Sequence, residues 1–178
     1  LGLHVTGKTV GIIGMGRIGE AIARRCHFGF GMTVIYYNRS AKSVDFDAEQ
    51  MDRIADVAAV ADFVVAAVPG GAETRHLIDA DVLSAMKPTS HLVNISRGDV
   101  VDEAALISAL QERRIAGAGL DVYEHEPQVP GALMAMENVV LLPHLGTAAL
   151  EVREAMGLKA VENLRAFFDG ETPPDRVT

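Results

Sequence analysis

The sequence predicts an α/β fold built on a doubly wound parallel sheet, and two observations support this expectation. Short apolar runs rich in Val and Ile recur along the chain, and longer segments with helical spacing separate them. Strands without polar alternation are expected to be covered on both faces, and interposed helices are the usual cover. The runs expected to form strands are residues 10–13, 33–37, 63–68, 92–95, 118–122 and 139–142.

Three segments are predicted to be helical. The first follows residues 10–13, and its apolar stripe is expected to pack on the sheet through Ile18, Ala21, Ile22 and Cys26. The second is expected from Asp102, as N-cap, to about Arg113, with four inward-facing residues, Ala105, Leu106, Ala109 and Leu110. The third is expected from about Ala148 to Phe168, ending near Gly170 and followed by Pro173 and Pro174.

The composition excludes several classes of protein. The 178 residues suffice for one domain with part of a second, and 49% hydrophobic residues exclude a disordered chain. A net charge of −8, without any dense basic run, disfavours binding to nucleic acid. The single cysteine, Cys26, excludes an intrachain disulfide and a cysteine-rich zinc site. It also fits a reducing compartment, so we expect a cytoplasmic protein. No His, Cys and Asp residues have the spacing of a metal site, and no apolar run approaches the roughly 20 residues of a membrane helix, so neither a metal site nor a membrane segment is expected.

A glycine-rich turn follows the first expected strand and opens the first expected helix. In VGIIGMGRIG, Gly14 permits a tight turn, Gly16 lets the backbone approach a pyrophosphate, and Gly19 lets the helix pack closely on the strand. The pyrophosphate would lie at the helix N-terminus, with Arg17 as an adjacent cation. The pattern predicts a Rossmann-type dinucleotide site, and the alternative is a tight turn that binds no ligand.

The choice of cofactor depends on the end of the second strand, in YYNRS. An acidic residue about 20 positions after the glycines would bind the ribose 2′-hydroxyl and repel a 2′-phosphate, but Asn38 stands there. Arg39 and Ser40 supply a guanidinium and a hydroxyl suited to a phosphate monoester, and Lys42 is an accessory candidate. The segment therefore favours NADP(H) over NAD(H), unless Arg39 is only a solvated cation.

Three further segments each lie at the carboxyl end of an expected strand. They are NISRGDVVDEAAL at 94–106, GLDVYEHEP at 119–127 and LLPHLG at 141–146. Ligands of open α/β sheets bind at these strand ends, so we expect Arg97, Glu126 and His144 to converge.

These four motifs, in this order, resemble the nucleotide-binding half of the D-isomer-specific 2-hydroxyacid dehydrogenases. This family includes D-lactate, D-glycerate, glyoxylate/hydroxypyruvate and phosphoglycerate dehydrogenases, and the resemblance covers essentially the whole chain. It implies that Arg97 binds the substrate carboxylate, that His144 is the acid/base and that Glu126 hydrogen-bonds His144. Glu124 is the competing carboxylate in the same loop, but the family's glutamate precedes a proline, which selects Glu126.

The resemblance also assigns contacts to the cofactor. Asp121 would accept a hydrogen bond from the nicotinamide carboxamide, although a strand-end aspartate can also cap a loop, and Gly146 would allow close approach to the nicotinamide. The remaining cofactor candidates are Ile18, Val68, Pro69, Ile95 and Thr74, the last as a hydroxyl at a helix start. The other histidines are expected to be structural or exposed, and they are His4, His27, His76, His91 and His125.

Members of the family are about twice this length and carry a second, substrate-binding domain. We therefore expect residues 1–147 to form the dinucleotide-binding domain and residues 148–178 to lead back to a substrate domain that is largely missing. Since the chain begins at Leu1 and not at a methionine, upstream sequence is expected to have been removed. By resemblance, the full-length protein is expected to be a homodimer, and the fragment alone is expected to turn over weakly or not at all.

The function expected is NADPH-linked reduction of a small 2-oxo acid such as glyoxylate or hydroxypyruvate. The first alternative is a non-catalytic nucleotide-sensing scaffold, like the corepressors that share this fold, and fold alone does not separate the two. A second alternative is a related oxidoreductase such as an alanine dehydrogenase or an adenosylhomocysteine hydrolase. The set of Arg97, Glu126 and His144 counts against that second alternative.

Overall fold

The computed structural model describes residues 3–176, and in these a parallel sheet alternates with helices. The strands are β1 (Thr9–Ile13), β2 (Thr33–Tyr37), β3 (Glu49–Gln50), β4 (Phe63–Ala66), β5 (His91–Asn94), β6 (Gly117–Leu120) and β7 (Val139–Leu141). The helices are α1 (Arg17–Phe30), α2 (Ile54–Val60), α3 (Ala80–Ala85), α4 (Glu103–Gln111), α5 (Gly131–Met134) and α6 (Leu150–Phe168). Two short 3₁₀ helices are η1 (Ala72–Thr74) and η2 (Gly98–Val100).

The strand order explains where a ligand can bind. The sheet runs β3-β2-β1-β4-β5-β6-β7, and each neighbouring pair is parallel. Strands β2 and β3 therefore lie on one side of β1, and β4 to β7 follow in order on its other side. This reversal is the topological switch point of a doubly wound sheet, and a crevice opens there beyond the carboxyl ends of the strands. The predicted fold class, Rossmann-type α/β, is confirmed.

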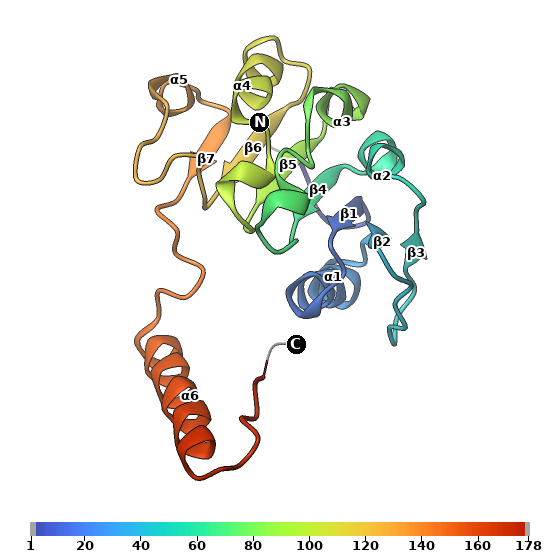
Figure 1. Ribbon diagram of the computed structural model, residues 1–178. Helices are drawn as coiled ribbons and strands as arrows, with labels where there is room; N and C mark the ends of the chain where they lie inside the picture. The colour runs from blue at the N-terminus through green and yellow to red at the C-terminus, as the bar shows by residue number, and fades with distance from the viewer. Residues whose placement is uncertain (1–2, 177–178) are drawn as a thin grey trace. The chain divides into compact units, whose positions relative to one another are not determined.

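Helices cover the two faces of the sheet unequally (Figure 1). One face packs against α2, α3 and α4 through a continuous apolar core that includes Val57, Leu83 and Leu106. The other face packs against α1 around β1, β2 and β4. The expectation that every strand is covered on both faces is wrong for β7, where Val140 is exposed.

The first helix differs from its expected packing. Ile18 is 64% exposed, whereas Gly19 and Ala23 are buried against the sheet, with Ile22 and Cys26 packed beside them. The helix axis approaches β1 so closely at Gly19 that the contact face is centred on the small residues. Ile18, one position earlier, is rotated away from the sheet by about 100° because an α-helix has 3.6 residues per turn.

The N-cap of α4 agrees with the sequence-based prediction, whereas strand β3 was not expected. Asp102 is the N-cap of α4, where its carboxylate accepts a hydrogen bond from Ala105 N at 2.9 Å, as predicted. Strand β3 was not predicted, because its two residues are polar and exposed and carry no apolar run. It forms only by pairing with β2, from Ile35 opposite Glu49 to Tyr36 opposite Gln50.

A partly buried carboxylate joins the amino ends of two strands. Asp62, just before β4, accepts hydrogen bonds from Thr9 N at 2.9 Å and from Lys87 Nζ at 3.0 Å. Burial acts to raise the pKa of Asp62, but the Thr9 N–H and the Lys87 ammonium outweigh it and lower that pKa. The ionised form of Asp62 therefore stabilises this end of the sheet.

The chain divides between His144 and Leu145 into two compact units. The second unit contains α6, which was expected from about Ala148 and begins at Leu150. Within this unit, Asp175 accepts hydrogen bonds from Asn163 Nδ2 at 2.8 Å and from Lys159 Nζ at 3.0 Å. These contacts hold the residues after the helix against it. Across residues 3–176, every helix is too short or too polar to cross a membrane.

Candidate cofactor and active site

The glycine-rich turn lies between β1 and α1, at the switch point of the sheet. Gly14 has a φ of 100°, a left-handed conformation that favours glycine, and a Cβ there would lie 2.7 Å from Ala67 O. At Gly19 a Cβ would overlap Gly14 O. Gly16 is different, because a Cβ there would meet nothing within 4 Å. Gly16 is also the N-cap of α1, where no side chain caps the helix.

These observations separate the tasks of the three glycines. Gly14 and Gly19 are required by the protein's own packing, whereas Gly16 faces open space at an uncapped helix N-terminus. Such a terminus presents backbone N–H groups and the positive end of the helix dipole to an anion. The residues present therefore fit a pyrophosphate held by the backbone.

Asn38 fastens the glycine-rich turn to the end of β2. Its Oδ1 accepts a hydrogen bond from Met15 N at 3.1 Å, and its Nδ2 donates to Ser40 O at 2.8 Å. Sequence reasoning treated Asn38 only as a residue that would not repel a phosphate. Its structural contacts were missed because the sequence gives no sign that Met15 N, 23 residues away, lies within reach.

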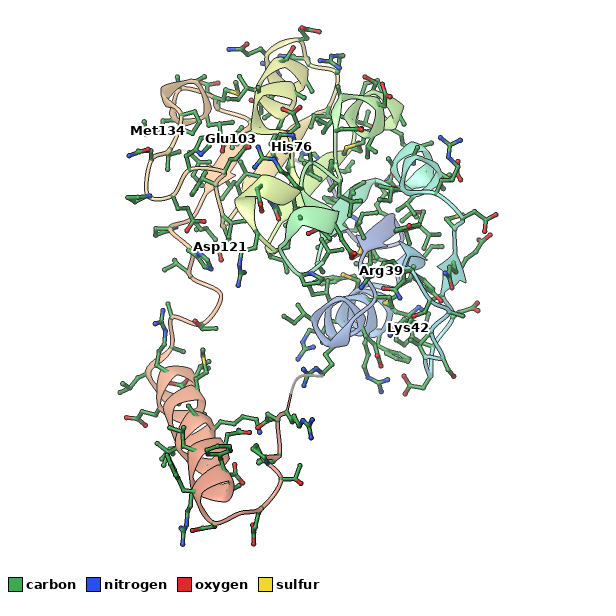
Figure 2. The ribbon with its side chains drawn as sticks, viewed as in Figure 1. Arg39, Lys42, His76, Glu103, Asp121 and Met134 are labelled. Atoms are coloured by element: carbon green, nitrogen blue, oxygen red, sulfur yellow. The ribbon has the colours of Figure 1, made fainter. Side chains whose placement is uncertain are left out.

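A cleft of about 440 Å³ opens beside this turn. One wall carries Asn38, Arg39, Ser40 and Lys42 after β2, and the other carries the segment from Val68 to Thr74 after β4. Arg39 reaches across to the second wall, where its Nη1 lies 2.9 Å from Glu73 Oε2. Arg39 and Lys42 both lie on the β2 side of the sheet, away from Asp121 (Figure 2).

Thr74 has a different position from the one expected. It is the last residue of η1 and not the start of a helix. Its hydroxyl donates to Pro69 O at 2.8 Å, so it stabilises the loop after β4. This side-chain hydrogen bond shapes the cleft wall through Val68 and Pro69, both of which line the cleft.

The loop after β5 positions Arg97. Asn94, only 1% exposed, accepts hydrogen bonds from Ser96 N at 3.0 Å and Ser96 Oγ at 2.8 Å. Its Nδ2 donates to Arg97 O at 2.9 Å. Gly98 follows, and a Cβ there would overlap the backbone of Tyr123. The Arg97 loop is therefore fixed both by a buried amide and by close contact with the segment after β6.

Glu126 and His144 form a hydrogen-bonded pair. His144 Nδ1 lies 2.9 Å from Glu126 Oε2, and Tyr123 N donates to Glu126 Oε1 at 3.1 Å. The hydrogen bond from His144 lowers the pKa of Glu126, and the Tyr123 N–H and the charge of Arg97 add to this against the effect of burial. Glu126 is therefore an ionised acceptor at neutral pH, and His144 Nδ1 carries the proton of this hydrogen bond.

Glu124, the competing carboxylate, has other partners. It lies 2.9 Å from His76 Nε2 and 3.0 Å from Arg75 Nη2. Burial acts to raise the pKa of Glu124, but the hydrogen bond from His76 and the charge of Arg75 outweigh it, so the pKa is lowered. The structure thus pairs His144 with Glu126 and engages Glu124 elsewhere.

Adjoining clefts connect the glycine-rich turn with this pair. Arg97 lines a cleft of about 420 Å³ together with Gly16, Arg17, Ile18, Val68, Pro69 and Ile95. Arg97 also lines the next cleft, of about 720 Å³, which contains Glu126 and His144. The Arg97 side chain lies over Gly70, where a Cβ would come within 2.7 Å of its Cγ. The first of these two clefts shares Gly16, Val68 and Pro69 with the cleft beside the glycine-rich turn. The three clefts therefore form one groove, which brings together the three candidate catalytic residues and most of the cofactor candidates.

Three cofactor candidates lie outside the linings of these clefts. Gly19 is one of them, because it packs against the backbone of Gly14. Asp121 is largely buried at the end of β6, and its backbone carbonyl accepts from His144 N at 2.9 Å. Gly146 lies in the second compact unit, two residues after His144. Over residues 3–176, no cluster of three His, Cys, Asp or Glu side chains is arranged to hold a metal ion.

The fold and the groove define a Rossmann-type dinucleotide-binding domain. Residues 1–146 match the family described as "D-isomer specific 2-hydroxyacid dehydrogenase, NAD binding domain". Since this match covers most of the chain, the protein belongs to that family, as its motifs indicated.

Similar proteins include curated relatives and solved structures. A glyoxylate reductase of Pyrococcus furiosus is 51% identical over 180 residues, covering 99% of this chain and 53% of the relative. A probable 2-ketogluconate reductase of Dictyostelium discoideum is 45% identical, covering 95% of this chain and 52% of the relative. The structure of an NADPH-dependent glyoxylate/hydroxypyruvate reductase from Sinorhizobium meliloti, in complex with NADP and malonate, superposes with a TM-score of 0.90 at 43% identity. That comparison covers 99% of this chain and 57% of the other, so the chain spans about half the length of the relatives it matches.

Proposed function

We propose that the full-length protein transfers a hydride between NADP(H) and a small 2-oxo or 2-hydroxy acid, with glyoxylate or hydroxypyruvate as the preferred oxo acid. The observation that carries this proposal is the Glu126–His144 pair beside Arg97, in a groove that continues to the glycine-rich turn. The names of the similar proteins support glyoxylate as a substrate. Arg39 on the cleft wall supports NADP(H) as the cofactor.

Each of the three residues has a role suited to its chemistry. Arg97 offers two parallel donors to the substrate carboxylate and places a positive charge near the carbonyl. When bound, NADPH would supply the hydride that reaches the carbonyl carbon. His144 then donates a proton to the carbonyl oxygen through Nε2, because Nδ1 is engaged by Glu126. Glu126 stabilises the protonated imidazole and fixes its orientation.

The cofactor contacts follow the groove. The backbone of Gly14, Gly16 and Gly19, with Arg17 and Ile18, would hold the pyrophosphate, and Arg39 with Ser40 would hold the 2′-phosphate. Asn38 would support both by fixing the turn and Ser40. The nicotinamide half would lie along the segments that carry Val68, Pro69, Thr74, Ile95, Asp121 and Gly146.

The direct test uses the full-length protein. Glyoxylate, hydroxypyruvate, pyruvate and phosphohydroxypyruvate are each offered with NADPH and with NADH, and cofactor oxidation is followed by absorbance. We expect the fastest oxidation with NADPH and one of the first two acids. If no oxo acid oxidises either cofactor while both still bind, the nucleotide-sensing scaffold is the better interpretation.

Cofactor preference is tested by Arg39→Ala. This substitution should weaken NADPH binding much more than NADH binding, because only NADPH carries the 2′-phosphate. Arg25→Ala is the matched control, since Arg25 is an exposed arginine on α1 outside the cleft linings that contain Arg39. Equal losses for the two cofactors in Arg39→Ala would contradict the phosphate assignment.

Residues 1–147 are proposed as the dinucleotide-binding domain, and residues 148–178 as the connection to a substrate domain. The full-length protein is proposed to be a homodimer. Sedimentation of the full-length protein tests the oligomeric state, and a monomer at micromolar concentration would contradict it.

A further inference from the structure

The cleft beside the glycine-rich turn contains an ion pair that joins its two walls. Arg39 follows β2 and Glu73 lies in η1 after β4, and β1 lies between these two strands in the sheet. Arg39 Nη1 and Glu73 Oε2 are 2.9 Å apart, and the two side chains are 80% and 83% exposed. Among the residues that line this cleft, Arg39 and Lys42 are the basic ones and Glu73 is the acidic one.

We propose that Glu73 reduces the preference for NADPH over NADH by competing with the 2′-phosphate for Arg39. This inference rests on the proposed function, in which Arg39 binds that phosphate. The carboxylate of Glu73 occupies the guanidinium in the structure. An incoming phosphate must either displace this carboxylate or share the guanidinium with it.

The charge of Glu73 acts against NADPH and not against NADH. A phosphate monoester near neutral pH carries between one and two negative charges, so it is repelled by a carboxylate held on the same guanidinium. The ribose 2′-hydroxyl of NADH is uncharged and meets no such repulsion. Glu73 therefore disfavours NADPH selectively, and its removal leaves Arg39 and Lys42 as an unopposed positive pair.

The ion pair can open without a large cost to the fold. Exposed ion pairs contribute little to stability because water and salt screen both charges. Displacement of Glu73 by phosphate therefore affects the binding equilibrium and leaves the sheet unchanged. The same screening limits the expected effect of Glu73 on NADPH affinity to about three- to tenfold.

Other roles for Glu73 predict other changes in NADPH binding when this residue is replaced. If Glu73 mainly held Arg39 in the orientation that receives the phosphate, its loss would weaken NADPH binding. If the pair were only a surface contact, its loss would change neither cofactor. The direction of the change therefore distinguishes the three possibilities.

The experiment measures the Kd values of NADPH and NADH for the full-length protein by cofactor fluorescence. Glu73→Gln should lower the Kd of NADPH by about three- to tenfold and change that of NADH by less than about twofold. Glu112→Gln is the matched control, because it breaks another surface pair, with Arg114 Nε at 3.0 Å, just after α4 and outside the cleft. This control should change neither Kd.

A double variant tests the mechanism. When Arg39→Ala is already present, adding Glu73→Gln should change the Kd of NADPH by less than about twofold, because the shared guanidinium is gone. An unchanged or higher Kd of NADPH in the single variant Glu73→Gln would overturn the inference. If instead Arg39→Ala fails to discriminate between the cofactors, the proposed NADP(H) preference itself is wrong.

Discussion

Replacing Glu126 by Gln tests the hydrogen bond on which the proposed acid/base role of His144 depends. Glutamine keeps the size of the side chain but has one acceptor oxygen, whereas Glu126 uses both oxygens, one for Tyr123 N and one for His144 Nδ1. The amide NH₂ must therefore face one of these two donors. In either orientation the protonated imidazole loses its anionic partner.

The structure sets the expected size of the effect. A hydrogen bond to a charged group contributes about 1.5–3 kcal/mol. Each kcal/mol added to the activation free energy lowers the rate roughly fivefold. The side chains of His144 and Glu126 are 47% and 36% exposed, so solvent screening favours the lower part of that range. We expect kcat to fall by about ten- to thirtyfold, while the KM for NADPH stays within about twofold.

The assay compares Glu126→Gln with Glu124→Gln in the full-length protein, with saturating glyoxylate and NADPH. Glu124 is two residues away in the same loop, but its carboxylate binds Arg75 and His76. Its substitution should change kcat by less than about threefold. Equal losses in the two variants, or an unchanged kcat in Glu126→Gln, would refute the reasoning.

Three further predictions concern the turn, the sheet and the Arg97 loop. Gly16→Ala should weaken cofactor binding by more than about tenfold and leave the Tm unchanged, because a Cβ at Gly16 meets no protein atom. Gly19→Ala should lower the Tm, because a Cβ at Gly19 overlaps Gly14 O. A lower Tm in Gly16→Ala would contradict this prediction. Asp62→Asn should cost about 1–2 kcal/mol in urea unfolding at pH 7. Because the pKa of Asp62 is lowered by folding, its stabilisation is present above the ordinary carboxyl pKa and is lost as the pH falls through the folded value, so the two proteins should converge in acid. Asn94→Ala removes three hydrogen bonds of the Arg97 loop, so it should lower the free energy of unfolding by about 2–3 kcal/mol. It should also raise the KM for the oxo acid more than the KM for NADPH. Equal increases in both KM values would count against a positioning role.

The sequence carries the parts of this fold that depend on local pattern. Uninterrupted apolar runs marked β1, β2, β4, β5 and β6, because strands covered by helices need no polar face. A similar run marked β7, although Val140 in that strand is exposed. Asp102 marked the start of α4, because its side chain bonds a backbone N–H only three residues away. The strand before Gly14 and the helix after it similarly located the switch point of the sheet.

The same reasoning was wrong where contact between elements decides the outcome. Helical periodicity could not show that α1 contacts the sheet through Gly19 and Ala23, which leaves Ile18 exposed. The position of Thr74 at the end of η1 was also missed, since its hydroxyl bonds carbonyls of a loop that has no regular pattern.

By itself, the sequence determined the class of fold, the place of the glycine-rich turn and the residue types gathered at the carboxyl ends of the strands. These follow from periodicity and from backbone requirements within a few neighbouring residues. The family resemblance of the motifs also indicated that Glu126 hydrogen-bonds His144, and in the structure these side chains lie 2.9 Å apart. Only the tertiary structure showed that Glu124 lies beside His76 and that Glu73 lies beside Arg39. Hydrogen bonds and ion pairs act over about 3 Å, so partners 18 to 48 residues apart are set by the order and register of the strands that carry them.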